Sequence, residues 1–547
     1  HIFNIKSGCN YFGGSTMEIK ELFRQNIPRA ILIIFLFVLY TLGGTVNEYL
    51  FKYALNDITA GNLTGYVQWQ AIELALELLV ALLLPVATQT MTRQVQNYIH
   101  QIRKDLTHHY YAGGDEKVSK MQNELTANLK LLDNDYATPW IDILSAVLQI
   151  VFGVALLISM NWLLLLFTAI LAVVTLLLPK IMEKKTSAAV KEVNVKNEKL
   201  LNTIEHWLGG LQELRRYTAY ARLSRELHKA SHSYVDANKQ SYKYRSISYI
   251  INTFGNAIAQ IGMSALAGFL FIFHQISFGD WAVAGSFAFL IFSSIFNMTS
   301  AITRVKSTKE LREQTFLLRK KIKDESENKQ LAYGITVSNL SAKYENGEQI
   351  SYPDFSIKPG AKVLLTGDSG TGKSTLFKLL LGKMKPESGE IKFTDQAGNL
   401  IPFAEAKVGY LPQDPIVFPA SISDNITMFN EKLADKVETV VSGMQLAPDL
   451  AKMPNGVQTV IDVKNENISG GQRQKVVLAR SVIHDQPFVL MDEVTSAIDR
   501  AGSEKIIDNL LHSNRTILMI AHNLSPEVKA KFDQEIKFTR TRKEANR

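Results

Sequence analysis

The stretch Gly367-Asp-Ser-Gly-Thr-Gly-Lys373-Ser374 follows an apolar run at 362–366, and a helix-like run begins at Thr375. A strand, a glycine-rich turn and a helix in this order are the context that a phosphate-binding P-loop requires. The glycines let several backbone N–H groups point at one anion, and the helix N-terminus adds partial positive charge. The sequence therefore predicts an α/β domain that binds a nucleotide.

Composition divides the chain of 547 residues into two unlike halves. Residues before about 305 carry long apolar runs, whereas residues after about 331 have the composition of a soluble α/β domain. The formal net charge is +8, but the basic residues gather between the apolar runs, which argues against a nucleic-acid partner. The single cysteine, Cys9, excludes an internal disulfide or a cysteine-ligated zinc site. We interpret residues 1–16, which precede Met17, as a tag, a fusion scar or a misassigned start.

Six runs are long and apolar enough for helices that cross a lipid bilayer, which requires about 20 residues. They lie at about Pro28–Tyr49, Val67–Thr90, Pro139–Ser159, Trp162–Leu178, Ile247–Phe273 and Trp281–Ile302. A signal peptide is an alternative for the first, but its apolar core is too long and no small-residue cleavage site follows. The sequence therefore predicts an N-terminal segment over 1–27 and an α-helical six-span transmembrane domain over 28–305.

Charge predicts the orientation of these spans. Lys and Arg are dense in the segments 91–136 and 180–246, whereas the alternate short connections carry only Lys52. Basic segments face the cytoplasm, so both ends of the chain are expected there. Both basic segments are rich in helix formers, which predicts helices that extend the spans into the cytoplasm, and 306–330 is expected to be a helical linker. The expected location is the cytoplasmic (inner) membrane of a bacterium.

Further motifs follow at 331–547 in a fixed order. Tyr344 lies about 23 residues before Gly367, where its ring can stack on adenine. Two apolar strand-like runs end in polar side chains, at Asp492-Glu493 and at His522. The remaining motifs are Gly409–Phe418 with Gln413, the segment Ile468-Ser469-Gly470-Gly471-Gln472, and Ser496–Asp499.

This set resembles the ATP-binding cassette (ABC) transporter family, and six spans ahead of one cassette resemble an exporter-type half-transporter. The resemblance implies ATP and Mg²⁺ as cofactors, with Glu493 polarising the attacking water and His522 contacting the γ-phosphate. It implies Mg²⁺ contacts at Ser374, Gln413 and Asp492. It implies nucleotide contacts at Tyr344, Gly367, Ser369, Gly370, Thr371, Gly372, Lys373, Ser374, Thr375, Gln413, Ser469, Gly470, Gly471 and Gln472.

The resemblance also implies a partner, because two such cassettes meet head to tail around ATP. The partner is a second half-transporter, and both a homodimer and a heterodimer remain open. The implied function is ATP-driven export across the membrane by alternating access, with a hydrophobic drug, a lipid or a peptide as the unknown substrate. An ATP-gated regulatory or channel-like membrane protein with low turnover is the alternative, and fusion of the spans to the cassette speaks against an importer.

The sequence departs from the family pattern at three places. Asp462–Asn467 stands where a Gly-Glu-x-Gly segment is usual, which puts the coupling to the membrane domain in doubt. Ile468 replaces a usual Leu and keeps an apolar anchor. Ala521 and Asn523 flank His522 where Thr and Arg are usual, and nothing in the sequence explains that change.

Two acidic residues lie within the predicted second span. Glu73 and Glu77 are one helical turn apart and share one face, so we hypothesise that they contribute to a path for cationic substrates. The favoured alternative is that this end of the helix projects into water, with Trp69 at the interface. Because only about 27 residues precede the first span, no peptidase domain is expected ahead of it.

Overall fold

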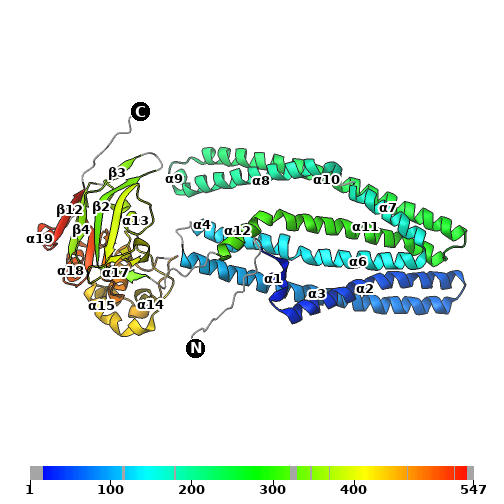
Figure 1. Ribbon diagram of the computed structural model, residues 1–547, viewed down its shortest axis with the longest axis horizontal. Coiled ribbons are helices and arrows are strands. Elements are labelled where there is room, and N and C mark those ends of the chain that lie inside the picture. The colour runs from blue at the N-terminus through cyan, green and yellow to red at the C-terminus, as the bar shows by residue number, and fades with distance from the viewer. Residues whose placement is uncertain are drawn as a thin grey trace. The chain divides into compact units, whose positions relative to one another are not determined.

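The computed structural model describes residues 17–113, 118–177, 180–320, 329–344, 348–368, 370–464, 466–522 and 524–538. The chain divides near residue 322 into two compact units. The first unit contains only helices among its described residues, and the second combines strands with helices (Figure 1).

Six long helices hold the predicted spans: α2 (Ile27–Thr59), α3 (Leu63–Ala112), α6 (Pro139–Met160), α7 (Trp162–Leu177), α10 (Tyr220–Ile272) and α11 (Phe278–Ser307). Shorter or more polar helices connect and flank them: α1 (Ile19–Arg24), α4 (Val118–Asn123), α5 (Leu129–Leu132), α8 (Lys180–Gly209), α9 (Leu211–Arg216), α12 (Lys309–Lys320) and the π-helical turns η1 (Glu124–Asn128) and η2 (Asp133–Ala137).

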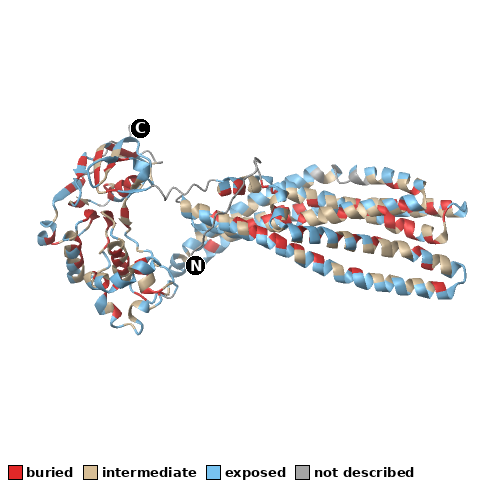
Figure 2. Ribbon diagram, turned by 60° about the horizontal axis from the view of Figure 1, so that its bottom comes forward, coloured by how far each residue is buried: buried red, intermediate tan, exposed pale blue. Residues whose placement is uncertain are grey.

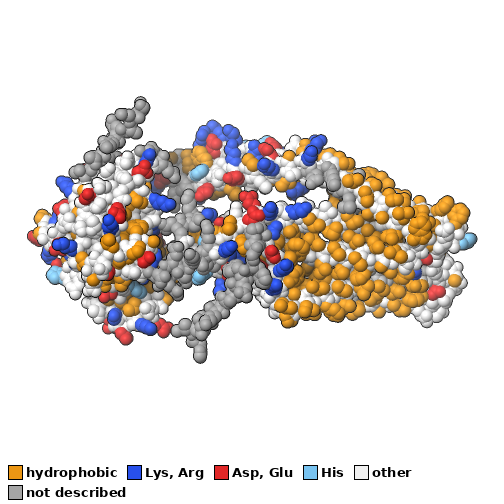
Figure 3. Space-filling view, in the orientation of Figure 1, with side chains coloured by type: hydrophobic (Ala, Val, Ile, Leu, Met, Phe, Trp, Pro, Cys, Tyr) orange, Lys and Arg blue, Asp and Glu red, His pale blue; other side chains and the backbone are white. Residues whose placement is uncertain are grey.

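The predicted α-helical membrane domain is confirmed. Among the described residues, five helices are long and apolar enough to cross a membrane, and the fourth predicted span is represented by a shorter apolar helix, Trp162–Val174. Apolar side chains cover the part of the unit that holds these spans, while charged side chains gather toward the other end (Figure 3). Leu82, for example, is 70% exposed, as expected for a side chain that faces lipid rather than water.

Several helices continue well beyond the length that a bilayer requires. α3 has 50 residues and α10 has 53. At about 1.5 Å per residue these helices are more than twice as long as the hydrocarbon core is thick. Their polar halves lie in the predicted basic segments 91–136 and 180–246, and α8, which packs along α10, lies in the second of these segments.

A buried ion-pair cluster ties α12 to the start of the chain. Arg319 places one guanidinium nitrogen 2.8 Å from a carboxylate oxygen of Glu21 on α1 and another 2.9 Å from one of Asp105 on α3. Burial alone would lower the pKa of Arg319, but the two carboxylates outweigh it and raise the pKa above its ordinary value. The carbonyl of Met17 accepts hydrogen bonds from Tyr136 and Arg312 beside this cluster.

Replacing Arg319 with Met is expected to destabilise the helical unit by about 3 kcal/mol, because it leaves two carboxylates facing a buried site without their cation. Thermal unfolding of the detergent-solubilised protein measures this as a lower Tm. Arg222→Met is the matched control, since Arg222 pairs with Glu226 at 3.0 Å while 59% exposed. Arg222→Met is expected to destabilise the unit by less than about 1 kcal/mol. Equal losses of stability in both variants would contradict the assignment of Arg319 to a buried ion-pair cluster.

The second unit is built on a parallel sheet with the strand order β12-β5-β11-β10-β9. These strands are β5 (Lys362–Gly367), β9 (Gly409–Leu411), β10 (Phe488–Asp492), β11 (Thr516–Ile520) and β12 (Gln534–Phe538). Every residue of β10 and β11 is buried, as expected for central parallel strands covered on both faces. Their carboxyl ends lie in register, with Asp492 opposite Ile520 and Ile520 opposite Leu365, so the segments that follow these strands emerge at one edge.

A second sheet and a set of helices complete this unit. The sheet runs β3-β2-β6-β7 with β4 beside β2, and a short parallel pair joins β1 to β8. These strands are β1 (Gln330–Leu331), β2 (Gly334–Lys343), β3 (Gln349–Ser351), β4 (Phe355–Ile357), β6 (Ser388–Thr394), β7 (Leu400–Ile401) and β8 (Ala406–Lys407). The helices are α13 (Lys373–Leu380), α14 (Ile422–Thr427), α15 (Val437–Gly443), α16 (Ala447–Leu450), α17 (Gly470–Ile483), α18 (Arg500–Leu511) and α19 (Pro526–Lys529).

Two apolar cores use the two faces of the parallel sheet. One packs Val489, Met491 and Ile517 against helices that include α14, α17 and α18. The other packs Leu490 and Leu518 against α13 and the second sheet. Alternate residues of one strand thus serve opposite cores, and the buried residues follow the strands (Figure 2). This packing confirms the predicted α/β class and fixes the sheet edge on which the site is built.

Candidate functional site

The P-loop connects the end of β5 to α13, as the sequence predicts. Gly367 has φ +150° and Gly372 has φ +92°, and a Cβ on Gly367 would lie 2.6 Å from the carbonyl oxygen of Phe538. Only glycine fits both positions without strain. Gly370 also has a positive φ, and Ser369 lies outside the described residues.

Lys373 lies inside this loop. Its ammonium donates to the carbonyl of Gly367 at 2.6 Å and to that of Asp368 at 2.9 Å, and the residue is only 7% exposed. Thr371 is also buried, and its hydroxyl bonds to the Asp368 carbonyl at 2.8 Å. A positive charge at the N-terminal end of α13 is the arrangement that attracts phosphate.

Tyr344 directly follows β2, and its hydroxyl hydrogen-bonds to that of Thr375 in the first turn of α13. The structure therefore brings this ring to the P-loop, while its stacking on adenine stays a prediction. A second tyrosine was missed by sequence reasoning: the Tyr352 hydroxyl donates to the Gly372 carbonyl at 3.1 Å, and its ring lies 5.5 Å from that of Phe538. No local spacing marks Tyr352, because it contacts Gly372 in the P-loop and Phe538 in β12, which are distant from it in sequence.

Asp492 ends β10 and is buried. Burial raises the pKa of Asp492, an effect that the hydrogen bond from Ser374 and the charge of Lys373 oppose. Asp492 and Ser374, two of the three predicted metal contacts, therefore lie together. Carboxylate and hydroxyl oxygens are the donors that Mg²⁺ prefers, so these residues fit that ion.

Glu493 is held in an unusual conformation next to Asp492. Its φ of 48° is in the left-handed region, and its N–H donates to the carbonyl of Ile520 at 2.9 Å. One carboxylate oxygen accepts from the Gln413 amide at 3.0 Å, and the other lies 3.1 Å from Nε2 of His522. This backbone conformation costs free energy for any residue other than glycine. It is found where surrounding contacts enforce it, often at functional sites. The structure thus brings Gln413, Glu493 and His522 together, as the motifs predict.

Ser469 caps the N-terminus of α17. Its hydroxyl accepts from the backbone of Gln472 at 3.2 Å, while the Gln472 side chain accepts from the Ser469 N–H at 2.8 Å. The Gln472 amide also donates to Asp449 at 3.2 Å, and Lys475 forms an ion pair with Asp449 at 2.7 Å. These contacts orient Ser469–Gln472 within their own subdomain, so their role toward a nucleotide of a second chain stays a prediction.

The glycines of this segment differ in how much room they have. A Cβ on Gly471 would lie 2.7 Å from the carbonyl oxygen of Ala497, whereas one on Gly470 would lie 3.8 Å from its nearest neighbour, the Ala497 Cβ. The Ala497 backbone is fixed in turn, since its N–H donates to Gln474 at 2.9 Å. Gly471→Ala must therefore displace the loop at 496–499.

We expect Gly471→Ala to destabilise the cassette by about 1–3 kcal/mol, as overpacking does, and Gly470→Ala to cost less than about 1 kcal/mol. Differential scanning fluorimetry of both variants measures the difference as a lower Tm for Gly471→Ala alone. A Tm for Gly471→Ala equal to that of Gly470→Ala would contradict the predicted clash.

The atypical segment before Ser469 forms a tight turn of its own. Asn467 accepts from the Asp462 N–H at 2.8 Å and donates to the Val460 carbonyl at 2.9 Å. Glu466 has φ 51° and lies 3.6 Å from Arg473. Asn465 lies outside the described residues, as does Asn523 beside His522. The Glu466 carboxylate thus pairs with a cation of its own cassette.

The two acidic residues in the predicted second span, Glu73 and Glu77, are paired with neutral amides. Glu77 accepts from Asn47 on α2 at 2.9 Å, and Glu73 accepts from Gln70 at 3.0 Å. Trp69, one turn away, stacks on Tyr53 with ring centroids 5.0 Å apart. Neither carboxylate is paired with a cation among these contacts, and the predicted cation path stays a prediction.

Comparison with known proteins places both units. The model of the ABC transporter transmembrane region matches residues 30–298, and the ABC transporter cassette model matches residues 350–496. The chain is similar to the lactococcin-A transport/processing ATP-binding protein LcnC of Lactococcus lactis, with 31% identity over 43% of this chain and 33% of that protein. It is also similar to the multidrug resistance-like ATP-binding protein MdlB of Buchnera aphidicola, with 23% identity over 76% of this chain and 73% of that protein.

The chain spans less than half the length of several relatives it matches: it covers 33% of LcnC and 43% of the mesentericin-Y105 transport/processing ATP-binding protein MesD of Leuconostoc mesenteroides, which is 30% identical over 54% of this chain. The fold is similar to that of a bacterial Atm1-family ABC exporter solved with ATP bound, with a TM-score of 0.78, 19% identity and coverage of 94% of each chain. A membrane-region match followed by a cassette match in one chain, with the same fold in a solved exporter, shows that this chain belongs to the ABC transporter family.

Proposed function

We propose that this chain is one half of an ATP-driven exporter, in which ATP hydrolysis at paired cassettes drives alternating access of the helical unit. The observation that carries the proposal is the position of Glu493. Its carboxylate is held between Gln413 and His522 at the edge where the P-loop emerges. An intact carboxylate at this position favours turnover over ATP-dependent gating alone.

The residues at this edge of the parallel sheet have different roles in phosphoryl transfer. The P-loop N–H groups and Lys373 bind the β and γ phosphates, and Glu493 accepts hydrogen bonds that orient it toward an attacking water. His522 holds that carboxylate and contacts the γ-phosphate. Gln413 uses its amide nitrogen for Glu493, so its amide oxygen is the atom that would hold a metal ion. Mg²⁺, held by Ser374, Asp492 and Gln413, supplies neutralisation of the phosphate charge when bound.

The site requires a second half-transporter, whose Ser469–Gln472 segment, or its equivalent, closes over the nucleotide bound to this chain. The proposed setting is the cytoplasmic membrane of a bacterium, with the cassette in the cytoplasm. The names of the relatives suggest a peptide or a drug-like molecule as the exported substrate.

The test is purification of the chain alone in lipid nanodiscs. We expect a dimer by mass photometry, and ATP hydrolysis that requires Mg²⁺ and is stimulated by a transported compound. Everted vesicles that contain the protein are then expected to accumulate that compound when ATP is added. ATP binding without hydrolysis would favour the ATP-gated alternative, and a monomer without activity would point to a heterodimer.

A further inference from the structure

The α2–α3 hairpin meets the rest of the helical unit differently at its two ends. At the predicted outer end, an apolar core joins α6, α7, α10 and α11 through side chains such as Leu157, Leu164, Met263 and Phe287. Among the described residues, Tyr49 is the only α2 side chain packed against this core. At the other end, apolar residues of α2 and α3 share a core with η2 and α12.

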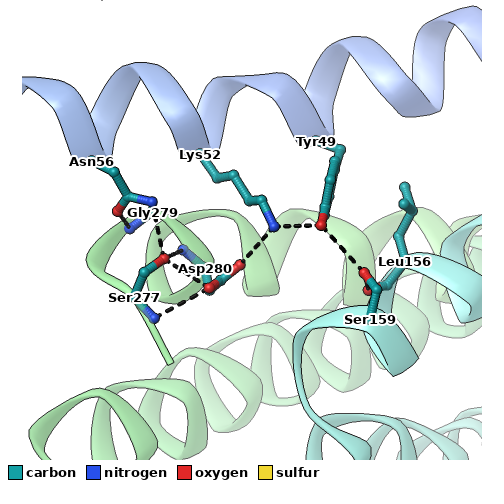
Figure 4. Close-up of polar contacts among 8 residues, drawn as sticks. All are labelled: Tyr49, Lys52, Asn56, Leu156, Ser159, Ser277, Gly279 and Asp280. Atoms are coloured by element: carbon teal, nitrogen blue, oxygen red, sulfur yellow. Dashed lines mark hydrogen bonds and ion pairs between the residues drawn. The ribbon is translucent and has the colours of Figure 1, made fainter. Parts of the chain in front are cut away.

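At this end, polar side chains form the contact between α2 and its neighbours α6 and α11 (Figure 4). We call this contact the seam. Lys52 of α2 forms an ion pair with Asp280 of α11 at 3.2 Å and donates to the hydroxyl of Tyr49. The Tyr49 hydroxyl lies 3.3 Å from that of Ser159, near the end of α6. One turn farther along α2, the Asn56 amide donates to Ser277 at 3.1 Å.

We call these residues the polar clasp: Tyr49, Lys52, Asn56, Ser159, Ser277, Gly279 and Asp280. The sequence interpretation placed Lys52 in a short connection, but α2 continues to Thr59 and Lys52 is only 8% exposed. A charged side chain buried in a membrane helix is expensive and marks function more often than packing.

The two backbones touch within the clasp. The N–H of Gly279 donates to the Asn56 side chain at 2.7 Å, and a Cβ on Gly279 would lie 2.1 Å from the carbonyl oxygen of Lys52. The Asp280 carboxylate is already oriented toward Lys52 by the capping box of α11. Its second oxygen accepts from the Ser277 hydroxyl at 2.7 Å and from the Ser277 N–H at 3.2 Å. The ion pair therefore forms without ordering the carboxylate first.

We propose that the polar clasp is a releasable gate, which holds α2 against α6 and α11 at the outer end and opens during each export cycle. Such a seam can separate reversibly because water replaces its ion pair and hydrogen bonds when the helices part. Separating the helices of the apolar core formed by α6, α7, α10 and α11 would instead expose apolar side chains to water, which is unfavourable. The inference rests on the proposed export function, since export requires the outer end to open.

The decisive experiment cross-links α2 to the start of α11 across the polar clasp. Cys9 is the only cysteine, so Cys9→Ser provides a background without thiols. Asn56→Cys with Ser277→Cys, joined by a short reducible bismaleimide, is expected to lower ATP-driven transport about tenfold, and reduction is expected to restore it. The matched control joins Tyr53→Cys to Trp69→Cys, which lie within the α2–α3 hairpin at the same end, and is expected to transport normally. Full transport by the protein tethered across the clasp would overturn the proposal.

A cysteine-labelling experiment measures how accessible the polar clasp is to solvent, and it does not require a transport assay. Ser277→Cys is expected to react slowly with a membrane-impermeant maleimide, and Lys52→Met is expected to raise that rate about fivefold. Exchange of the charges, with Lys52→Asp and Asp280→Lys together, is expected to restore slow labelling. Equal labelling rates with and without Lys52→Met would overturn the clasp as a closure. If the Cys9→Ser parent neither hydrolyses ATP nor transports, the proposed function fails, whereas labelling still decides the clasp.

Discussion

Replacing Glu493 with Gln is expected to reduce steady-state ATP hydrolysis by about 100-fold or more, because the amide cannot act as a base toward the attacking water. The substitution preserves the size and planarity of the side chain, so contacts with Gln413 and His522 are kept in an altered hydrogen-bonding pattern. ATP binding is expected to stay intact, since the P-loop and Lys373 are unchanged. The variant should therefore trap ATP in the paired cassettes.

The measurement combines phosphate release with retention of radiolabelled ATP after rapid removal of free nucleotide. Glu504→Gln is the matched control, because Glu504 lies on the exposed side of α18, where it pairs with Arg500 at 3.2 Å. This control is expected to hydrolyse ATP at the parent rate. Turnover by Glu493→Gln close to that of the parent would remove Glu493 from the role of base.

Much of the candidate site was predictable because its signals are local. The P-loop combines a strand, glycines and a helix within a few residues, and Asp492-Glu493 and His522 each follow a run of buried apolar residues. Parallel strands present their carboxyl ends at one sheet edge, so side chains that directly follow β10 and β11 must come together. Gln413 joins them for the same reason, since it follows β9, which pairs with β10.

The contacts that sequence reasoning missed join residues far apart in the chain. Lys52 and Asp280 are separated by most of the helical unit, and neither lies in a pattern that predicts the other. Arg319 reaches Glu21 and Asp105 across a similar separation. Hydropathy also ends a helix where polar residues begin, which is why the first span was ended at Tyr49 although α2 continues for ten residues more. Buried polar partners keep that part of the helix folded, and periodicity cannot show them.

Replacing Lys373 with Ala is expected to weaken ATP binding about 10- to 100-fold, because charge-assisted hydrogen bonds to the β and γ phosphates are lost. The buried ammonium lies inside the P-loop, within 2.9 Å of two loop carbonyls, so it already lies at the proposed phosphate site. Equilibrium binding of a fluorescent ATP analogue to the purified protein measures the effect as a higher Kd.

Lys378→Ala is the matched control for this prediction, since Lys378 lies on the exposed side of the same helix, α13. It removes the same charge near the same loop, so it accounts for long-range electrostatics, and its Kd is expected to stay within about twofold of the parent value. A Kd for Lys373→Ala equal to that of Lys378→Ala would contradict a phosphate contact by Lys373. Lys373→Ala and Glu493→Gln together are then expected to separate binding from chemistry: Lys373→Ala binds the nucleotide more weakly, whereas Glu493→Gln retains it and stops its hydrolysis.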